Sequence, residues 1–142
     1  MKKEIGVFIL NDYGQILLQK RSRNKKNYPN MWALCTGHVE KNEDVQDAAI
    51  RELKEELGID VSIKELHSFA NGKFDIINEN SSTYFFCIKC NLKEGKFIIQ
   101  KEELLQVKWF DIIDVISMIK NNDETIVYSK NRINLFEYLL ES

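Results

Sequence analysis

The sequence has 142 residues, which is enough for one domain with its own hydrophobic core. Its 20 basic and 22 acidic residues leave a formal net charge of -2, so the overall charge gives no attraction for a nucleic-acid polymer or an acidic membrane surface. No stretch approaches the length of a transmembrane helix, and no apolar leader follows the basic residues at the start. We therefore expect a cytoplasmic protein without a membrane partner.

The first third of the chain predicts a β-hairpin, a basic loop and a short strand. Residues 5–10 and 15–21 are apolar and rich in strand-forming side chains, and the turn-forming residues 11–14 separate them. Residues 22–30 are polar and basic and contain the only proline, which indicates a surface loop. Residues 31–36 then predict a short buried strand that leads to Gly37.

An amphipathic helix is predicted from about residue 44 to residue 57, and Gly58 follows where a left-handed C-terminal cap is expected. At about 100° per residue, Glu52, Glu55 and Glu56 fall within one arc of this helix. Carboxylates at this spacing repel one another unless cations neutralise them, and their oxygens suit Mg²⁺ or Mn²⁺. We expect this arc to face a cleft and the adjacent apolar arc to pack, with Ala49, Ile50, Leu53 and Leu57.

The remainder of the chain alternates between strand-like and helix-like patterns. Residues 61–69, 74–77, 83–92 and 104–110 predict strands. Two helices are expected after them, one capped by Asp111 or Asp114 and a terminal one capped by Ser129. With no repeat or linker in the sequence, we predict a single mixed α/β domain over residues 1–142.

Two of the three cysteines, Cys87 and Cys90, have the C-x-x-C spacing of some redox and zinc sites. They lie in the strand-like run 83–92, where residues three apart point to opposite faces. This geometry opposes a shared metal or a disulfide, so we expect two small apolar strand residues.

Basic side chains are concentrated just before the carboxylate helix, and they include Lys20, Arg21 and Lys25. A run of charge is often only a solvated surface. The position of this run, one short strand before the helix, favours a clamp for phosphate oxygens.

The spacing of residues 37–59 resembles the Nudix box, the signature of the Nudix (MutT-like) hydrolase superfamily. Counting from Gly37, the pattern places Glu43, Arg51-Glu52, Glu55-Glu56 and Gly58 in the register of the box. The resemblance implies the Nudix fold, in which a mixed β-sheet is sandwiched between helices. It also implies hydrolysis of a nucleoside diphosphate linked to another moiety, with Mg²⁺ or Mn²⁺ as cofactor.

By position in the box, the resemblance implies that Glu52, Glu55 and Glu56 hold the metals, together with the carbonyl of Gly37. Arg51 would orient this cluster by pairing with Glu43 or Glu52. The catalytic set is therefore Arg51, Glu52 and Glu55.

A general base must activate the attacking water, and the resemblance leaves two positions open for it. One is a glutamate of the box, for which Glu52 is our first choice. The other is a glutamate of a later loop, Glu103 or Glu102, and Glu103 is also a candidate metal ligand.

Residues 17–40 resemble the branch of the superfamily that includes isopentenyl diphosphate isomerase, especially at Gly37-His38. In that branch Lys20, Arg21 and Lys25 would meet the diphosphate, and His38 is a further candidate for substrate binding. The isomerase has a cysteine directly before the Gly-His pair, whereas this chain has Thr36 there. Cys35 comes one residue early and, in a strand, would point to the opposite face. Hydrolysis is therefore favoured over isomerisation.

A Nudix-fold sensor that binds a nucleotide without cleaving it is a further alternative. Such a protein could tolerate the loss of catalytic acids, so the complete set of box residues argues against it. A small-molecule diphosphate is the expected partner, and a homodimer is an assembly that the sequence leaves open.

Overall fold

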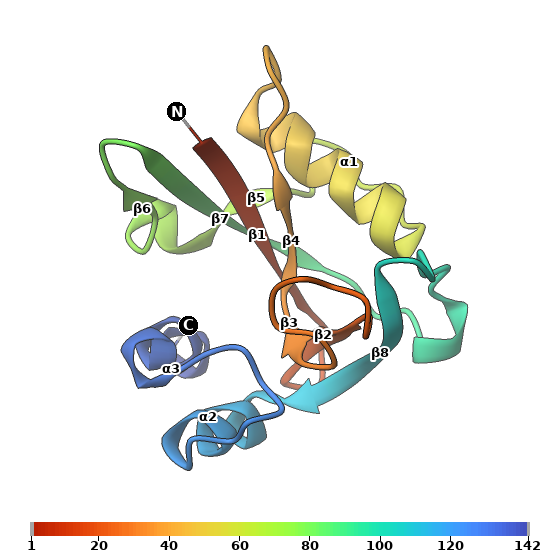
Figure 1. The fold of residues 1–142 in the computed structure, drawn as a ribbon, viewed down its shortest axis with the longest axis vertical. Coiled ribbons are helices and arrows are strands. Elements are labelled where there is room, and N and C mark those ends of the chain that lie inside the picture. The colour runs from red at the N-terminus through yellow and green to blue at the C-terminus, as the bar shows by residue number, and fades with distance from the viewer. Residues whose placement is uncertain (1, 142) are drawn as a thin grey trace.

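A mixed β-sheet with helices on both faces organises the computed structural model, which describes residues 2–141 (Figure 1). The strands are β1 Lys2–Leu10, β2 Gln15–Arg21, β3 Trp32–Ala33, β4 Cys35–His38, β5 His67–Ser68, β6 Ile76–Ile77, β7 Ser81–Lys89 and β8 Leu104–Asp111. The α-helices are α1 Val45–Leu57, α2 Ile112–Lys120 and α3 Ile133–Glu141, and short 3₁₀ turns occupy Phe69–Gly72, Glu94–Lys96 and Lys130–Arg132. The prediction of a mixed α/β fold is confirmed. Positions 1 and 142 of the predicted domain lie outside the described residues.

Strand β1 is central and pairs with three neighbours. It runs parallel to β7 from the Lys2–Ser81 pair to the Leu10–Lys89 pair, and antiparallel to β2 and β4. The predicted hairpin of β1 and β2 is confirmed, and Gly14 adopts a φ of 72° in its turn. Strand β8 extends the sheet by pairing antiparallel with β2.

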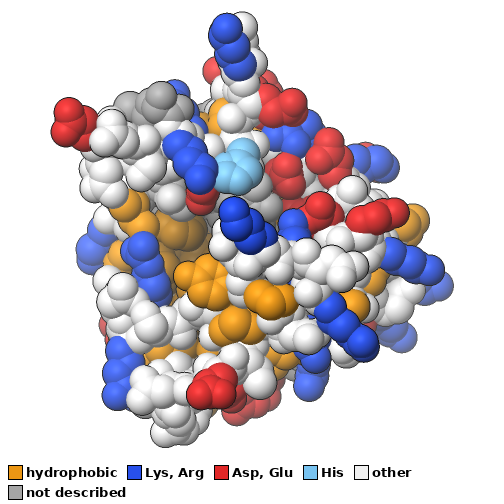
Figure 2. All heavy atoms as spheres, in the orientation of Figure 1, with side chains coloured by type: hydrophobic (Ala, Val, Ile, Leu, Met, Phe, Trp, Pro, Cys, Tyr) orange, Lys and Arg blue, Asp and Glu red, His pale blue; other side chains and the backbone are white. Residues whose placement is uncertain are grey.

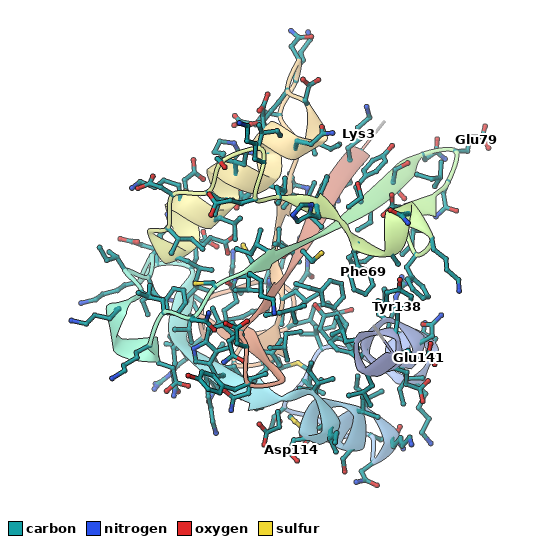
Figure 3. The ribbon with its side chains drawn as sticks, turned by 180° about the vertical axis from the view of Figure 1, so that it is seen from behind. Lys3, Phe69, Glu79, Asp114, Tyr138 and Glu141 are labelled. Atoms are coloured by element: carbon teal, nitrogen blue, oxygen red, sulfur yellow. The ribbon has the colours of Figure 1, made fainter. Side chains whose placement is uncertain are left out.

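Two hydrophobic clusters lie on opposite faces of the sheet. Because side chains alternate along a strand, Val7 of β1 packs with α1, whereas the neighbouring Phe8 packs with α2 and α3. Figure 3 shows Phe69 and Tyr138 against each other in the second cluster, and their ring centroids are 5.4 Å apart in an edge-to-face arrangement. Helix α1, which carries the carboxylates, thus packs on one face of the sheet, and α2 and α3 pack on the other.

The predicted strand over residues 31–36 is two strands with different partners. β3 pairs with β2, whereas β4 pairs with β1. Between them, the backbone N–H of Leu34 donates to the Tyr128 hydroxyl at 3.0 Å instead of to a strand. Gly37 and His38, expected to follow the strand, belong to β4.

Several other boundaries differ from the sequence prediction. Of residues 61–69 only His67–Ser68 is a strand, because Ser62 and Glu65 hydrogen-bond to each other in a local turn. The strand predicted at 74–77 is limited to Ile76–Ile77. β7 begins and ends earlier than the predicted 83–92. A 3₁₀ turn after Ser129 precedes α3, so Ser129 does not cap that helix itself.

The C-x-x-C pair occupies opposite faces of the sheet, as predicted. Cys87 packs against the cluster under α2 and α3, and Cys90 packs against the cluster under α1. Both thiols are free. A separate observation concerns the helices between residues 2 and 141: each is too short or too polar to cross a membrane.

Candidate active site

Helix α1 is anchored so that its acidic side borders a cleft. Ala49, Leu53 and Leu57 are fully buried against the sheet. The helix begins at Val45 after Asp44, within a residue of the predicted start. Gly58 ends it with a φ of 71°, the left-handed cap that the sequence predicts, and a Cβ there would lie 2.7 Å from the Ile98 Cβ.

A cleft of about 400 Å³ lies beside α1, and we call it the carboxylate cleft. Figure 2 shows acidic side chains gathered along α1, with basic side chains and a histidine beside them. Lys20 and Glu102 are the predicted candidates that do not line this cleft; those that do are Arg21, Lys25, Gly37, His38, Arg51, Glu52, Glu55, Glu56 and Glu103. Segments far apart in the chain therefore meet here.

Arg51 is the hub of the hydrogen bonds at the cleft. Its guanidinium donates to both oxygens of Glu43, at 2.9 and 3.0 Å, and to Glu52 at 2.7 Å. It also reaches Glu55 at 3.3 Å and the carbonyl oxygen of His38 at 2.9 Å. The hydrogen bonds to Glu43 and then to Glu52 raise the pKa of Arg51, and the hydrogen bond from Arg51 lowers the pKa of Glu43. Arg51 thus pairs with both of its expected partners and ties β4 to α1.

Glu56 is buried at the inner end of the cleft, with 8% of its surface exposed. Its Oε1 accepts a hydrogen bond from the Gln19 amide at 2.8 Å, and its Oε2 lies 3.4 Å from the Cys35 thiol. Burial, and then the hydrogen bond with Glu52, raise the pKa of Glu56 to about 8. In the metal-free protein, therefore, the ionised form of the Glu56 carboxyl group is disfavoured.

Sequence reasoning missed Gln19, and it did not foresee the contact of Cys35 with Glu56. Cys35 does point to the opposite face from Thr36, as expected, but that face carries Glu56. Strand alternation offered a signal for Gln19, because it places this polar side chain on the same face as the buried Leu17.

The donors at the cleft fit a hard divalent cation by their chemistry. Glu52, Glu55 and Glu56 supply carboxylate oxygens along one wall, and Gly37 lies against Glu52. Between residues 2 and 141, however, no three acidic, histidine or cysteine side chains are arranged as a ready-made metal site. Arg51 binds both Glu52 and Glu55, so these two carboxylates are directed toward the guanidinium.

The predicted basic residues are placed differently from one another. Lys25 forms an ion pair with Glu103, and both side chains line the cleft. Arg21 also lines it and donates to the carbonyl oxygen of Asn27 at 3.0 Å. Lys20 is not brought to the cleft, because strand alternation turns it to the other face, where its ammonium lies 5.9 Å from the centre of the Trp32 ring.

The two remaining candidates lie near the surface. His38 is exposed at the rim of the cleft, and its Nδ1 is 3.6 Å from the Glu4 carboxylate. Glu102 is exposed and does not line the cleft, unlike its neighbour Glu103.

A second cleft of about 380 Å³ adjoins the first, and we call it the side cleft. The two clefts share Arg21, Thr36, Gly37 and His38. The side cleft continues between the loop and the segment before α3, where its lining includes Asn27, Tyr28, Val127 and Tyr128. A molecule bound at the carboxylates would therefore have space for a second group.

Comparison with known proteins gives the family. The family model of the NUDIX domain matches residues 2–129. The chain is 33% identical over 125 residues to the uncharacterized Nudix hydrolase lmo0368 of Listeria monocytogenes, which covers 87% of this chain and 71% of that protein. It is 27% identical over 129 residues to isopentenyl-diphosphate Delta-isomerase 2 of Aromatoleum aromaticum, covering 88% of this chain and 66% of the isomerase. It is 28% identical over 112 residues to Nudix hydrolase 8 of Arabidopsis thaliana. The match covers 79% of this chain but only 30% of that longer protein.

Solved structures share the fold. DR0079 of Deinococcus radiodurans superposes with a TM-score of 0.76 at 18% identity, over 97% of this chain and 82% of that chain. The E. coli dihydroneopterin triphosphate pyrophosphohydrolase gives a TM-score of 0.72 at 22% identity, over 99% and 96%. The predicted Nudix fold is confirmed, and two of the sequence relatives carry the name Nudix hydrolase. By its fold and by the NUDIX domain that covers most of its length, the chain belongs to the Nudix family.

Proposed function

We propose that this protein hydrolyses the diphosphate linkage of a nucleoside diphosphate joined to another moiety. The observation that carries the proposal is the single cleft in which the carboxylates of α1 face Arg21 and Lys25. A diphosphate with its metal ion needs both kinds of group, since its oxygens are negative and its metal is positive. The adjoining side cleft offers room for the rest of the substrate.

We assign the metal, Mg²⁺ or Mn²⁺, to Glu52, Glu55, Glu56 and the carbonyl of Gly37. When bound, such an ion neutralises charge on the diphosphate and lowers the pKa of a coordinated water. Arg51 orients Glu52 and Glu55 of this set through its hydrogen bonds to them, and Glu43 holds the guanidinium in place. Glu103 is a further candidate ligand because it lines the same cleft.

Glu52 is our choice for the general base that takes a proton from the attacking water. It lines the cleft with only 14% of its side chain exposed. Glu103 is the alternative, and each candidate is held in an ion pair, Glu52 with Arg51 and Glu103 with Lys25. Arg21, Lys25 and His38 are assigned to the substrate, whereas Lys20 faces away from the cleft.

The substrate is best identified with a panel of diphosphates. It should include an ordinary and an oxidised nucleoside triphosphate, a nucleotide sugar, ADP-ribose, a dinucleoside polyphosphate and an isoprenoid diphosphate. Release of phosphate, pyrophosphate or nucleoside monophosphate is measured with Mg²⁺, with Mn²⁺ and with chelator. We expect metal-dependent release from at least one compound, and release from none would overturn the proposal.

Isomerisation of a five-carbon diphosphate is the second candidate, favoured by the resemblance to the Aromatoleum isomerase. Thr36 stands where the isomerase resemblance calls for cysteine, and Cys35 points toward Glu56 instead. Interconversion of the two five-carbon diphosphates would establish this alternative. A non-catalytic nucleotide sensor would instead bind a compound of the panel without releasing product. Homodimer formation and a cytoplasmic location remain predictions from the sequence.

A further inference from the structure

The carboxylate of Glu56 is held from two strands at once. Gln19 on β2 donates to Oε1 at 2.8 Å, and the thiol of Cys35 on β4 lies 3.4 Å from Oε2. Both residues are buried, Gln19 with 4% and Cys35 with 1% of its surface exposed. Each oxygen of the carboxylate thus has its own donor on a fixed backbone.

The position of Gln19 is costly for a polar side chain. It follows Leu17 on the face of β2 that packs against α1, where an apolar side chain would extend the hydrophobic cluster. A buried amide costs free energy unless it is hydrogen-bonded, and Glu56 is the partner of its Nε2 atom. The hydrogen bond from the Gln19 amide therefore orients the Glu56 carboxylate.

That orientation matters for the side of Glu56 that faces the cleft. An ionised carboxylate accepts up to about four hydrogen bonds or metal contacts. Gln19 and Cys35 take one position on each oxygen and leave the others toward Glu52 and the carboxylate cleft. Groups that hold a metal-binding side chain from behind typically change metal affinity by about 10–100-fold when they are lost.

We propose that Gln19 and Cys35 are positioning residues that fix the Glu56 carboxylate for metal binding, an inference that rests on the proposed function. Gln19 provides the stronger hold and Cys35 the weaker, because a thiol is a poor donor. Neither needs to touch the substrate. Their loss should appear first in the affinity for the metal and only then in turnover.

The test replaces Gln19 with methionine, which has nearly the same shape but no N–H donor. Gln106→Met is the matched control, because Gln106 is exposed on the neighbouring strand β8. Binding of Mn²⁺ to the substrate-free protein is measured by calorimetry or by the loss of the free-ion EPR signal. Thermal unfolding in chelator, and kcat as a function of Mn²⁺ concentration, are measured on the same preparations.

We expect Gln19→Met to bind Mn²⁺ about tenfold more weakly than wild type and to need correspondingly more Mn²⁺ for half-maximal turnover. Gln106→Met should match wild type in both. Unchanged Mn²⁺ affinity in folded Gln19→Met would overturn the role of Gln19.

A pair of Cys35 variants tests the second donor and keeps the inference open to refutation if Gln19→Met does not fold. Cys35→Ala removes the donor and should weaken Mn²⁺ binding about threefold, whereas Cys35→Ser supplies a hydroxyl donor and should restore it. Equal affinities for alanine, serine and wild type would overturn the role of Cys35.

The wild-type measurements separate this inference from the proposed function. A wild type that binds Mn²⁺ but releases no product from the diphosphate panel would refute the proposed function and leave the positioning role standing. A wild type that binds no Mn²⁺ would refute the positioning role, and the diphosphate panel would then test the proposed function by itself. An active, Mn²⁺-binding wild type with indifferent Gln19 and Cys35 variants would refute the positioning role alone.

Discussion

Gly37 and Glu52 are packed so closely that a Cβ atom on residue 37 would lie 2.3 Å from the Glu52 Cδ atom. The glycine stands in β4 opposite Ile5, and the Glu52 side chain passes over it from α1. The φ of Gly37 is not in the left-handed region, so the need for glycine is steric rather than conformational. Any side chain at this position must displace the carboxylate that we assign to the metal and the water.

Gly37→Ala should therefore lower kcat by about 100-fold, because a displacement of about 1 Å in a reacting group has an effect of this size. Steady-state kinetics with saturating metal would measure it. Gly95→Ala is the control, since nothing lies within 4 Å of a Cβ at that glycine. A fully active Gly37→Ala protein would show that Glu52 can work from another position.

Arg51→Lys keeps the positive charge but loses the planar fork that reaches Glu43 and Glu52 together. One lost charge-assisted hydrogen bond is worth about 1.5–3 kcal/mol, so kcat/KM should fall about tenfold or more. The same change at Arg132, which lies in the 3₁₀ turn before α3 and does not line the carboxylate cleft, should leave kcat/KM nearly unchanged. Equal loss in both variants would mean that the fork of Arg51 is not needed.

Glu52→Gln and Glu103→Gln distinguish the two candidates for the base. If Glu52 is the base, its variant should lose about 100-fold or more in kcat, and Glu103→Gln should lose much less. Glu79→Gln is a control on a corner far from the cleft, labelled in Figure 3. The reverse order of effects would transfer the role of base to Glu103.

Glu56 should make the metal-free protein less stable as the pH rises. The pKa of this group is raised from its ordinary 4.5 to about 8 by burial and by Glu52. Between about pH 5 and pH 8 the unfolded chain has lost this proton while the folded chain keeps it, so the free energy of unfolding falls over this range. Urea unfolding in chelator measures the free energy of unfolding of wild type and Glu56→Gln at several pH values. We expect a smaller fall with rising pH in Glu56→Gln than in wild type. Parallel pH profiles would contradict the raised pKa.

The hydroxyl of Tyr128 should contribute to stability because it accepts the hydrogen bond from the backbone N–H of Leu34. Tyr128→Phe leaves that buried donor without this partner and should lower the free energy of unfolding by about 1–2 kcal/mol. Tyr13→Phe, at a side chain that is 80% exposed, should change it little. Urea denaturation at one pH compares the two, and similar values would argue against a structural role for the Tyr128 hydroxyl.

The sequence was informative where contacts are local. The acidic face of α1 and the cap at Gly58 follow from helix periodicity and from one glycine, and both agree with the structure. The pairing of Arg51 with Glu43 and Glu52 involves residues at most eight positions apart. Motif spacing captures such neighbours directly.

It was less informative where the contact joins separate elements. The bond from Gln19 to Glu56 spans 37 positions and depends on how β2 lies under α1, which no local pattern reveals. The division of residues 31–36 into β3 and β4 likewise depends on Tyr128, which is 94 positions from Leu34. Lys20 is a local contact that was nevertheless predicted wrongly. Strand alternation turns its side chain away from the cleft, but the prediction grouped it with the basic residues of the following loop.

The shared wall of the two clefts has a consequence for how substrate preference can change. Most of the carboxylate cleft is built on α1 and the paired strands, where Arg51 holds Glu52 and Gly37 packs against it, and the loop contributes Lys25. The outer parts of the side cleft come from the loop that carries Tyr28 and from the segment that carries Tyr128. Substitutions at the loop residues of the side cleft can therefore change which leaving group the protein accepts. The carboxylates of α1 that we assign to bond cleavage stay the same.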